Sequence, residues 1–326
     1  MRILITGGAG CLGAALVEKY LSEGHEVLVI DNFATGSRDL FPPGYPGLTM
    51  VEGSIADPAV VESCFSGFAP SHVIHSAASY KDPNDWREDV RTNVEGMVTV
   101  AAAARAAGVR RFVNFQTALC YGRPEGVPIP LSHPLRPFTS YGISKTAGEQ
   151  YLMMSGLPAV SLRLANVTGP RLAIGPIPTF YKRLKAGQAC FCSDSVRDFL
   201  DMADFLEIVD VVMADDAPTG TFNVSTGDGH TIKEIFDIVA DHLGLRPAPA
   251  VPVVPTGPDD VPRVVLDPGE TERILGWRAR RGFAETIRAT LDWYDTYGVN
   301  TIYSHLQAPS HPPAGSEAML KSDSHD

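Results

Sequence analysis

Short runs of almost continuous apolar residues alternate with longer amphipathic stretches through the first half of the chain. Such runs are typical of strands in a parallel sheet, because helices cover both faces of that sheet. The predicted strands span 2–6, 25–31, 48–53, 71–77 and 111–116. Helices are predicted over 11–24 and 93–108, each ending at a glycine that can adopt the left-handed conformation of a helix C-terminus. The pattern predicts an α/β fold with a doubly wound parallel sheet.

The pattern changes near Asn166. A Gly- and Pro-rich stretch over 166–180 is predicted to be a loop that leads into a helix over 180–187. Amphipathic helices are also predicted over 231–244 and 283–298. The segment 246–262 is too dense in proline for a long helix. The second half therefore predicts a smaller, mostly C-terminal α/β domain.

Composition narrows the class of protein. The chain has 326 residues, of which 44% are hydrophobic and 20% charged, as in soluble globular proteins. Its formal net charge of −11 is spread without a long run of one sign. Nucleic acid is therefore not expected as a partner, because phosphate binding needs a concentrated basic surface. No apolar run reaches the roughly 18–20 residues of a membrane span, so no membrane partner is expected.

Cysteine usage and the N-terminus bear on the compartment. Five cysteines at irregular spacing do not suggest a disulfide framework, and Cys190 and Cys192 are too close for the usual zinc knuckle. Glycines interrupt the apolar N-terminus where a signal peptide would continue. We therefore expect a reduced, cytoplasmic protein with no metal site.

A glycine-rich turn separates the first predicted strand from the first helix. Its glycines are Gly7, Gly10 and Gly13. Glycines suit a phosphate-binding turn because side chains would block the approach of a pyrophosphate, although a tight turn can also need them for geometry alone. The next strand ends in Asp31 and Asn32, where an acidic group bonds the adenosine ribose and repels a 2′-phosphate. The pattern predicts dinucleotide binding and favours NAD, while Arg38 leaves NADP open.

Further motifs follow in order along the chain. They are "TGGAGCLG", "IDNFATGSR", "HSAA", "TNVEG", "FQTALCYG", "YGISK", "LRLANVTGPR", "RDF" and "GTFNVSTG". With them, from Arg2 to about Gly298, the chain resembles the extended short-chain dehydrogenase/reductase family. Within that family it resembles the NAD-dependent nucleotide-sugar epimerases and dehydratases of the UDP-glucose 4-epimerase type. The resemblance implies NAD as cofactor and a nucleotide-diphosphate sugar as substrate.

The resemblance also implies a division into domains. An NAD-binding Rossmann domain is expected at 1–165, with 196–224 returning to it. A nucleotide-sugar-binding domain is expected from 166–195 and 225–306. The polar, Pro- and Ser-rich end, 307–326, is predicted to be a disordered tail.

Tyr141 and Lys145 lie four residues apart, which places both on one face of a helix about 6 Å apart along its axis. A phenolate near pH 7 requires lowering the tyrosine pKa by roughly 3 units, about 4 kcal/mol. One positive charge about 4 Å away, at an effective dielectric of 20, supplies a term of that order. The bland alternative is a packed tyrosine and a solvated lysine. By resemblance, Tyr141 and Lys145 are the proton-transfer pair.

By the same resemblance, Thr117 orients the reacting sugar hydroxyl, although a threonine at a strand end is commonly just a strand residue. Tyr141 would take the hydroxyl proton as hydride leaves the same carbon for NAD⁺. The dehydratases carry an acid and a base at the two positions after this threonine, and the related decarboxylases carry a glutamate at the second. Here these positions are Ala118 and Leu119, which cannot exchange protons. Cys120 is interpreted as a small buried apolar residue.

The prediction is therefore epimerisation of a nucleotide-activated hexose, with C4 the favoured carbon and a transient 4-keto sugar as intermediate. Three alternatives stay open. One is a dehydratase or an oxidoreductase of the same family. Another is a dinucleotide-sensing protein without catalysis, and the third is a structural or interaction protein in which the motifs are coincidental.

The resemblance assigns a set of residues to the cofactor. They are Gly7, Gly10, Cys11, Leu12, Gly13, Asp31, Asn32, Ser54, Ile55, Ala77, Ala78, Asn93, Tyr141 and Lys145. Ser54 replaces the aspartate that usually accepts from the adenine amino group, and Asp57 is a candidate substitute. His75 is expected to be a buried structural histidine.

Three residues are assigned to the substrate, namely Thr117, Asn166 and Arg197. Asn166 is expected to contact the diphosphate, and a planar guanidinium such as that of Arg197 suits phosphate oxygens. The alternative for Arg197 is a salt bridge with Asp194 or Asp198. A second arginine of the family is missing from 257–260, and the candidates to compensate for it are Lys182, Arg183 and Arg263. The nucleotide stays open among UDP, dTDP, GDP and CDP.

A homodimer is also expected. The alanine-rich helix over 94–107 and the helix that begins near Tyr141 are predicted to pair across a two-fold axis, as in many relatives. Packing of the alanine-rich helix on its own sheet accounts for its apolar side equally well.

Overall fold

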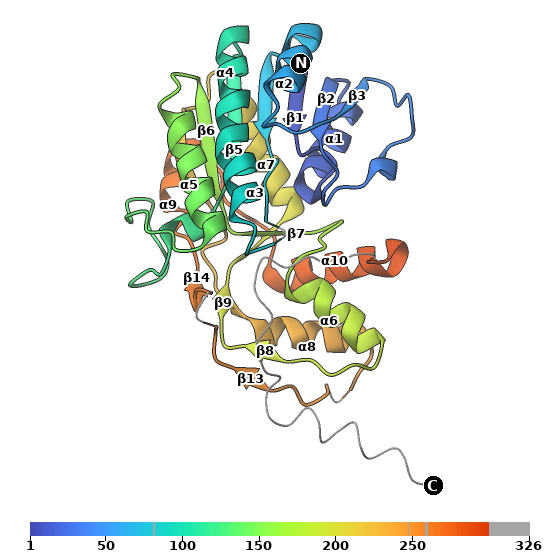
Figure 1. The fold of residues 1–326 in the computed structure, drawn as a ribbon. Coiled ribbons are helices and arrows are strands. Elements are labelled where there is room, and N and C mark those ends of the chain that lie inside the picture. The colour runs from blue at the N-terminus through green and yellow to red at the C-terminus, as the bar shows by residue number, and fades with distance from the viewer. Residues whose placement is uncertain (81, 247, 258–259, 300–326) are drawn as a thin grey trace.

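A seven-stranded parallel sheet forms the upper part of the molecule in the computed structural model (Figure 1). The structure describes residues 1–299 except 81, 247, 258 and 259, so the predicted tail at 307–326 lies outside the described residues. In spatial order the strands are β11 (Gly220–Val224), β6 (Ala159–Leu164), β5 (Arg111–Thr117), β4 (His72–His75), β1 (Arg2–Thr6), β2 (Glu26–Asp31) and β3 (Leu48–Glu52). The predicted doubly wound α/β fold is confirmed.

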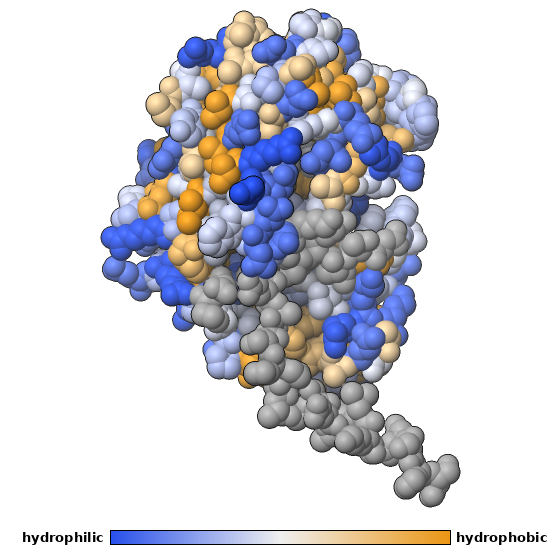
Figure 2. Space-filling view, viewed as in Figure 1, coloured by the Kyte–Doolittle hydropathy of each residue, from blue (hydrophilic) through white to orange (hydrophobic). Residues whose placement is uncertain are grey.

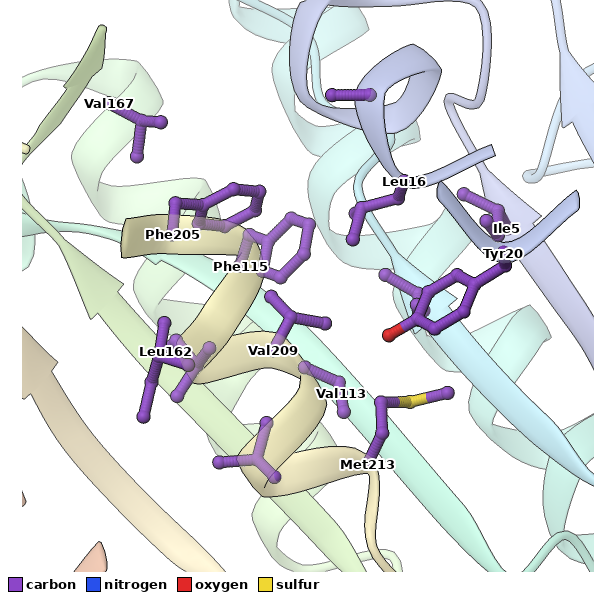
Figure 3. Packing of buried hydrophobic residues seen from close by; sticks show 14 of the residues in the cluster. Ile5, Leu16, Tyr20, Val113, Phe115, Leu162, Val167, Phe205, Val209 and Met213 are labelled. Carbon is purple, nitrogen blue, oxygen red and sulfur yellow. The ribbon is translucent and has the colours of Figure 1, made fainter. Parts of the chain in front are cut away.

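Successive strand residues point to opposite faces of the sheet, and a helical layer covers each face. Ile3 and Ile5 face a core that contains Leu16 of α1 (Cys11–Ser22) and Phe205 of α7 (Met202–Met213). Figure 3 shows Phe205, Val209 and Met213 packed beside Phe115, Val113 and Leu162. Leu4 faces the opposite core. The helices of that second layer are α2 (Pro58–Phe68), α4 (Met97–Ala107) and α5 (Ser140–Met153).

The predicted helix ends agree with the structure. Gly24, Gly108, Gly244 and Gly298 follow helices with positive φ of 78°, 65°, 73° and 76°, which glycine adopts without strain. One prediction needs correction, because the helix expected over 93–108 is not regular throughout. A π-helical turn, Arg91–Gly96, joins the short α3 (Trp86–Val90) to α4. Within that turn, the Asn93 side chain forms hydrogen bonds with Ser79 and Ser144, which lie on two other segments.

The smaller domain lies below the carboxyl ends of the sheet strands (Figure 1). Its helices α6 (Pro176–Lys185), α8 (Ile232–His242) and α10 (Phe283–Tyr297) enclose a separate core around Phe180, Phe236 and Leu291. Its short strands are β8 (Cys192–Ser193), β9 (Val196–Arg197), β12 (His230–Thr231), β13 (Val253–Val254) and β14 (Arg263–Val264). The predicted loop over 166–180 is shorter than expected, because α6 already begins at Pro176.

Contacts at two places connect the large sheet with the smaller domain. Strand β7 (Asn166–Thr168) pairs in parallel with β10 (Phe199–Asp201) at the junction of the two parts, and α9 (Gly269–Leu275) contacts β11 of the large sheet. Short 3₁₀ turns occur at Arg38–Leu40 and Ala118–Tyr121. Across the described ranges, no helix has the length and apolar content needed to cross a membrane.

Candidate active site

A cavity of about 1470 Å³ opens between the large sheet and the smaller domain. Ligands of open α/β sheets bind at this edge, outside the carboxyl ends of the strands. The structure brings most of the predicted site residues to its wall. These are Gly7, Gly10, Cys11, Leu12, Asp31, Asn32, Ser54, Ile55, Ala77, Ala78, Thr117, Tyr141, Lys145, Asn166 and Arg197. Gly13 and Asn93 are the two predicted residues that do not line it.

The glycine turn needs glycine at two of its three positions. Gly7 has φ of 67°, and a Cβ there would lie 2.7 Å from the Cα of Ala77. A Cβ on Gly13 would overlap the carbonyl oxygen of Gly7. The turn therefore exposes backbone to the cavity just before the N-terminus of α1. That arrangement fits a pyrophosphate, which binds to backbone N–H groups at a helix N-terminus.

Buried side chains of β1 and β4 hold the cavity wall beside this turn, at Ala77. Thr6 Oγ1 accepts a hydrogen bond from the Ala77 N–H (3.2 Å) and lies 3.1 Å from His75 Nδ1. Burial, with a smaller effect of the Lys145 charge, lowers the pKa of His75 to about 3, so its ring is neutral. This agrees with the predicted structural role for His75.

Asp31 lines the cavity at the end of β2. Its Oδ2 accepts from the Ala9 N–H (2.9 Å) and its Oδ1 from the Phe33 N–H (2.8 Å). Each carboxylate oxygen keeps a lone pair, so a ribose hydroxyl can still donate to it. Arg38, which left NADP open, is ion-paired with Glu52 and lies 4.4 Å from the centre of the Phe33 ring.

Ser54 lines the cavity, and its Oγ accepts from the Ala56 N–H (3.2 Å). Asp57, the candidate substitute for the missing adenine contact, is exposed and lies outside the cavity wall. Its carboxylate caps α2 by accepting from the Ala59 N–H (3.0 Å). Asp57 therefore has a local reason to be acidic that does not involve adenine.

The proposed reactive residues come from the end of β5 and the first turns of α5. Gln116 joins the two elements, since its Nε2 donates to the Lys145 carbonyl (2.9 Å) and its Oε1 accepts from the Thr117 N–H (2.7 Å). Thr117 Oγ1 accepts from the Leu119 N–H (3.2 Å). Because its acceptor side is used locally, the threonine hydroxyl hydrogen remains free to donate into the cavity.

Burial controls the charge of the pair. It lowers the pKa of Lys145 to about 8, against the opposing effect of the Glu149 carboxylate. It raises the pKa of Tyr141 above its ordinary value, and the electrostatic influence of the nearby Tyr80 and Asp89 adds to that rise. In the protein alone, burial therefore outweighs any lowering of the Tyr141 pKa by the Lys145 charge. Near pH 7 a neutral phenol lies one helical turn from a mostly charged ammonium, and a further positive charge is needed to form the phenolate.

Asn93 is buried, and its side chain links two segments of the chain by hydrogen bonds. Its Oδ1 accepts from the Ser79 N–H (2.9 Å), and its Nδ2 donates to the Ser79 carbonyl (3.2 Å) and to Ser144 Oγ (3.0 Å). It fixes the segment after Ala78 to α5. Cys120 is fully buried, and burial raises the pKa of its thiol to about 12, which agrees with the predicted apolar role.

Arg197 has a partner that the sequence did not indicate. Its Nη2 lies 2.7 Å from Asp260 Oδ1, and its Nη1 donates to the carbonyls of Val196 (2.9 Å) and Pro262 (3.3 Å). The salt bridges considered with Asp194 and Asp198 are not found. Those two carboxylates instead accept from backbone and hydroxyl groups of 226–227 and 256.

Other cavity residues have no sequence signal in the motifs above. They are Ser79, Tyr80, Asp82, Asp85, Glu88, Leu172, Ile174, Phe180 and Phe191. Of the three candidates to compensate for the missing arginine, only Arg183 lies on the wall, where its Nε donates to the Ala189 carbonyl (2.7 Å). Asn166 also lines the cavity, and its Nδ2 donates to the Asp198 carbonyl (2.9 Å). Within the described ranges, no group of three or more His, Cys, Asp or Glu side chains is arranged to hold a metal.

The fold and the cavity define a dinucleotide-binding α/β enzyme. Residues 3–225 match the model of the NAD dependent epimerase/dehydratase family, and the chain belongs to this family. The predicted family, enzyme class and NAD cofactor are thereby confirmed.

Individual relatives cover nearly the whole chain. A UDP-glucose 4-epimerase of Corynebacterium glutamicum is 31% identical over 88% of this chain and 93% of its own. Among solved structures, the Bordetella bronchiseptica enzyme WbmG in complex with NAD and UDP is 65% identical, with a TM-score of 0.90, over 95% of this chain and 99% of that one. The Thermus thermophilus UDP-glucose 4-epimerase in complex with NAD is 35% identical, with a TM-score of 0.81, over 91% and 100%.

Proposed function

We propose that this protein is an NAD-dependent epimerase of a nucleotide-activated hexose, acting at C4 through a transient 4-keto sugar. One observation carries the proposal. Thr117, Tyr141 and Lys145 share a cavity with the glycine turn, whereas Ala118 and Leu119 offer no further acid or base. Elimination of water needs such groups, but inversion at one carbon does not. The UDP-glucose 4-epimerases among the relatives support the same choice over a dehydratase.

The chain's own residues account for binding and proton transfer. The backbone around Gly7 and Gly10 would hold the pyrophosphate of NAD, and Asp31 the adenosine ribose. Bound NAD supplies an acceptor and a donor of hydride at the sugar carbon. Thr117 orients the reacting hydroxyl, Tyr141 exchanges its proton, and the Lys145 charge favours the phenolate. This proton would travel out and back along the same route when the configuration is inverted.

Cations at the other end of the cavity support a nucleotide-diphosphate sugar. Arg197, Arg183 and Asn166 all line the cavity. The UDP bound by the related WbmG favours a UDP-linked sugar here. We accordingly infer that 1–165 with 196–224 hold NAD and that 166–195 with 225–306 hold the nucleotide sugar.

We further infer a cytoplasmic homodimer that associates through α4 and α5. Large apolar side chains are exposed on these helices, and Figure 2 displays hydrophobic residues gathered over that part of the upper domain. The exposed large apolar side chains of α4 and α5 include Val98, Ile143, Tyr151 and Met153. All five cysteines are free, which suits a reducing compartment.

The test begins with the nucleotide that the purified protein carries. Denaturation followed by mass spectrometry should release near-stoichiometric NAD⁺, because an epimerase recycles its cofactor in place. UDP-hexoses are then incubated with the enzyme and the C4 epimers are separated. Tyr141→Phe should retain NAD⁺ but lose turnover by about 10²–10⁴-fold, the usual contribution of a positioned general acid–base group.

Other outcomes would identify the rival reactions. Net accumulation of NADH or NADPH would indicate an oxidoreductase, and a product lighter by one water would indicate a dehydratase. If Tyr141→Phe kept turnover close to that of the wild type, the proton-transfer assignment would be wrong. Lys145→Arg serves as a control that keeps the positive charge.

A further inference from the structure

A buried glutamine joins the two elements that carry the proposed reactive residues. Gln116 is the next-to-last residue of β5 and is 2% exposed, although it borders the cavity. Its Nε2 donates to the Lys145 carbonyl (2.9 Å), and its Oε1 accepts from the Thr117 N–H (2.7 Å). An amide side chain carries both donors and an acceptor, so this one residue holds two backbone groups of opposite polarity.

The bond to Lys145 is additional to those that form the helix. Within an α-helix each carbonyl accepts from the N–H four residues later, and a carbonyl oxygen has two lone pairs. Gln116 uses the second lone pair of Lys145, which lies inside α5. Because the helix can form without this bond, its effect is to fix where Lys145 lies relative to β5.

The bond to Thr117 acts where β5 loses one of its neighbours. Strand β4 ends opposite Asn114, so the last residues of β5 extend beyond that strand. The Thr117 N–H donates to Gln116, and Thr117 Oγ1 accepts from the Leu119 N–H (3.2 Å). Two hydrogen bonds therefore hold Thr117 at the point where the sheet supports it on one side only.

Helix α5 also approaches the turn after Thr117 closely. A Cβ on Gly142 would lie 3.1 Å from the Leu119 carbonyl oxygen. This contact limits how near the first turn of α5 comes to that segment, but close packing alone does not fix a position along the helix axis. A hydrogen bond is directional and does fix it, and Gln116 supplies such a bond to Lys145.

We infer that Gln116 is a positioning residue that sets the spacing between the Thr117 hydroxyl and the Tyr141–Lys145 pair. The inference rests on the proposed proton transfer by these residues. Gln116 acts through the two backbone groups that it holds. A misplacement of about 1 Å can lower a rate about 10²-fold, because the reacting hydroxyl must meet Thr117 and Tyr141 at the same time.

Gln116→Met tests the inference, because methionine is similar in length and flexibility but forms neither hydrogen bond. In the holoenzyme kcat at saturating UDP-hexose should fall about 10–100-fold, while KM and the NAD content stay close to those of the wild type. Hydrogen–deuterium exchange gives a second readout that needs no turnover. The peptide that contains the Thr117 amide should exchange faster, because this amide loses its acceptor.

Asn114→Leu is the matched control. Asn114 is fully buried two residues earlier on the same face of β5, and its Nδ2 donates to Ser161 Oγ (2.9 Å) of β6. This variant also loses a buried hydrogen bond, so it should lose stability as Gln116→Met does. Its kcat should nevertheless stay close to that of the wild type, because the lost bond ties β5 to β6 and not to α5.

A kcat of Gln116→Met equal to that of the wild type, or an equal loss of kcat in both variants, would overturn the inference. A raised KM with an unchanged kcat would overturn it too, since Gln116 would then act on binding. If Gln116→Met does not fold, Gln116→Asn replaces it. Its amide is one methylene shorter and cannot reach both partners, so kcat should again fall, and an unchanged kcat would contradict the inference.

The proposed function has a different point of failure. Absence of epimerisation in the wild type would count against it, whatever the variants do. Faster exchange at Thr117 in Gln116→Met would still show in that case that the glutamine holds this residue.

Discussion

Glu149 lies one helical turn beyond Lys145, yet it does not raise the lysine pKa above its ordinary value. Its carboxylate is already committed, since Oε2 lies 2.8 Å from Arg163 Nη2 and Oε1 accepts from Ser161 Oγ (2.7 Å). Both members of the Glu149–Arg163 pair are buried. The arginine neutralises most of the field that would otherwise reach Lys145, so burial dominates and lowers the lysine pKa to about 8. Lys145 thus remains charged near pH 7 but is poised to titrate just above it.

His75 gives a pH-dependent prediction at the same scale. Its pKa is about 3 in the folded protein and about 6.5 when unfolded, so the unfolded chain binds more protons between these values. Stability therefore rises with pH through this window and is lost as the pH falls below 6.5. At pH 5 the loss should be about 2 kcal/mol. Urea unfolding at pH 7.5 and 5 should show this dependence, and His75→Gln should reduce it.

The comparison of the two slopes isolates His75 from the carboxylates that also titrate in acid. A destabilisation of His75→Gln at pH 7.5 is compatible with the assignment, because the variant also alters the contact with Thr6, provided that the variant loses less stability than the wild type between pH 7.5 and 5. The same pH dependence in both proteins would mean that His75 is solvated or protonated in the native state.

Prediction from sequence succeeded in placing residues that depend on spacing along one element on the same cavity wall, while their roles stay predictions. Tyr141 and Lys145 share a helix face, and Thr117 ends the strand beside it. It failed where a contact joins distant segments. Arg197 pairs with Asp260, sixty-three residues away, while the sequence suggested only its acidic neighbours.

The same distinction holds for whole elements. The predicted strands β1, β2, β4 and β5 read as apolar runs because both of their faces are buried, whereas the edge strand β3 is only partly buried. Strand β6 was not among the predictions, since Ser161 and Arg163 interrupt its apolar pattern, and both are buried because Glu149 satisfies them. In β11 the buried Asn223 accepts from the Tyr121 hydroxyl (2.6 Å). Buried polar residues with distant partners thus conceal a strand from its own sequence.

The turn between β1 and α1 supports a prediction about an element. Gly13→Ala places a methyl group against the Gly7 carbonyl, so the backbone of the turn must shift. We expect a loss of about 1–3 kcal/mol, as for other overpacked sites, together with loss of most of the NAD that co-purifies. Chemical unfolding and the ratio of released NAD to protein measure the two effects.

Gly67→Ala is the control for this change. Gly67 lies in α2, and a Cβ there meets nothing within 4 Å. Alanine should therefore raise stability by about 0.5–1 kcal/mol, because glycine is the poorer helix residue. Normal NAD content in Gly13→Ala would show that the pyrophosphate does not depend on this turn.

At the scale of the whole molecule, the cavity exists because the large sheet domain and the smaller domain, each with its own core, meet at one edge of the sheet. The pairing of β7 with β10 fixes how the smaller domain is placed against the large sheet. Arg197 belongs to β9, which comes just before β10 in the chain. Sequence patterns predict each of the two domains but do not determine the angle at which the domains meet. That angle decides which side chains of 79–92 and 172–191 reach the cavity wall.

The proposed dimer gives the last prediction. Ile143 is 51% exposed on α5, one residue from the buried Ser144, so its side chain faces away from the chain's own core. Ile143→Asp should convert the dimer to a monomer in sedimentation analysis, because two uncompensated carboxylates would be buried across the two-fold axis. Val253→Asp, 52% exposed in the smaller domain, should leave the dimer intact. Since Tyr141 and Ile143 share the first turns of α5, the monomer should also show a higher KM as that turn loosens. Dissociation by the Val253 variant and not by the Ile143 variant would move the interface to the smaller domain.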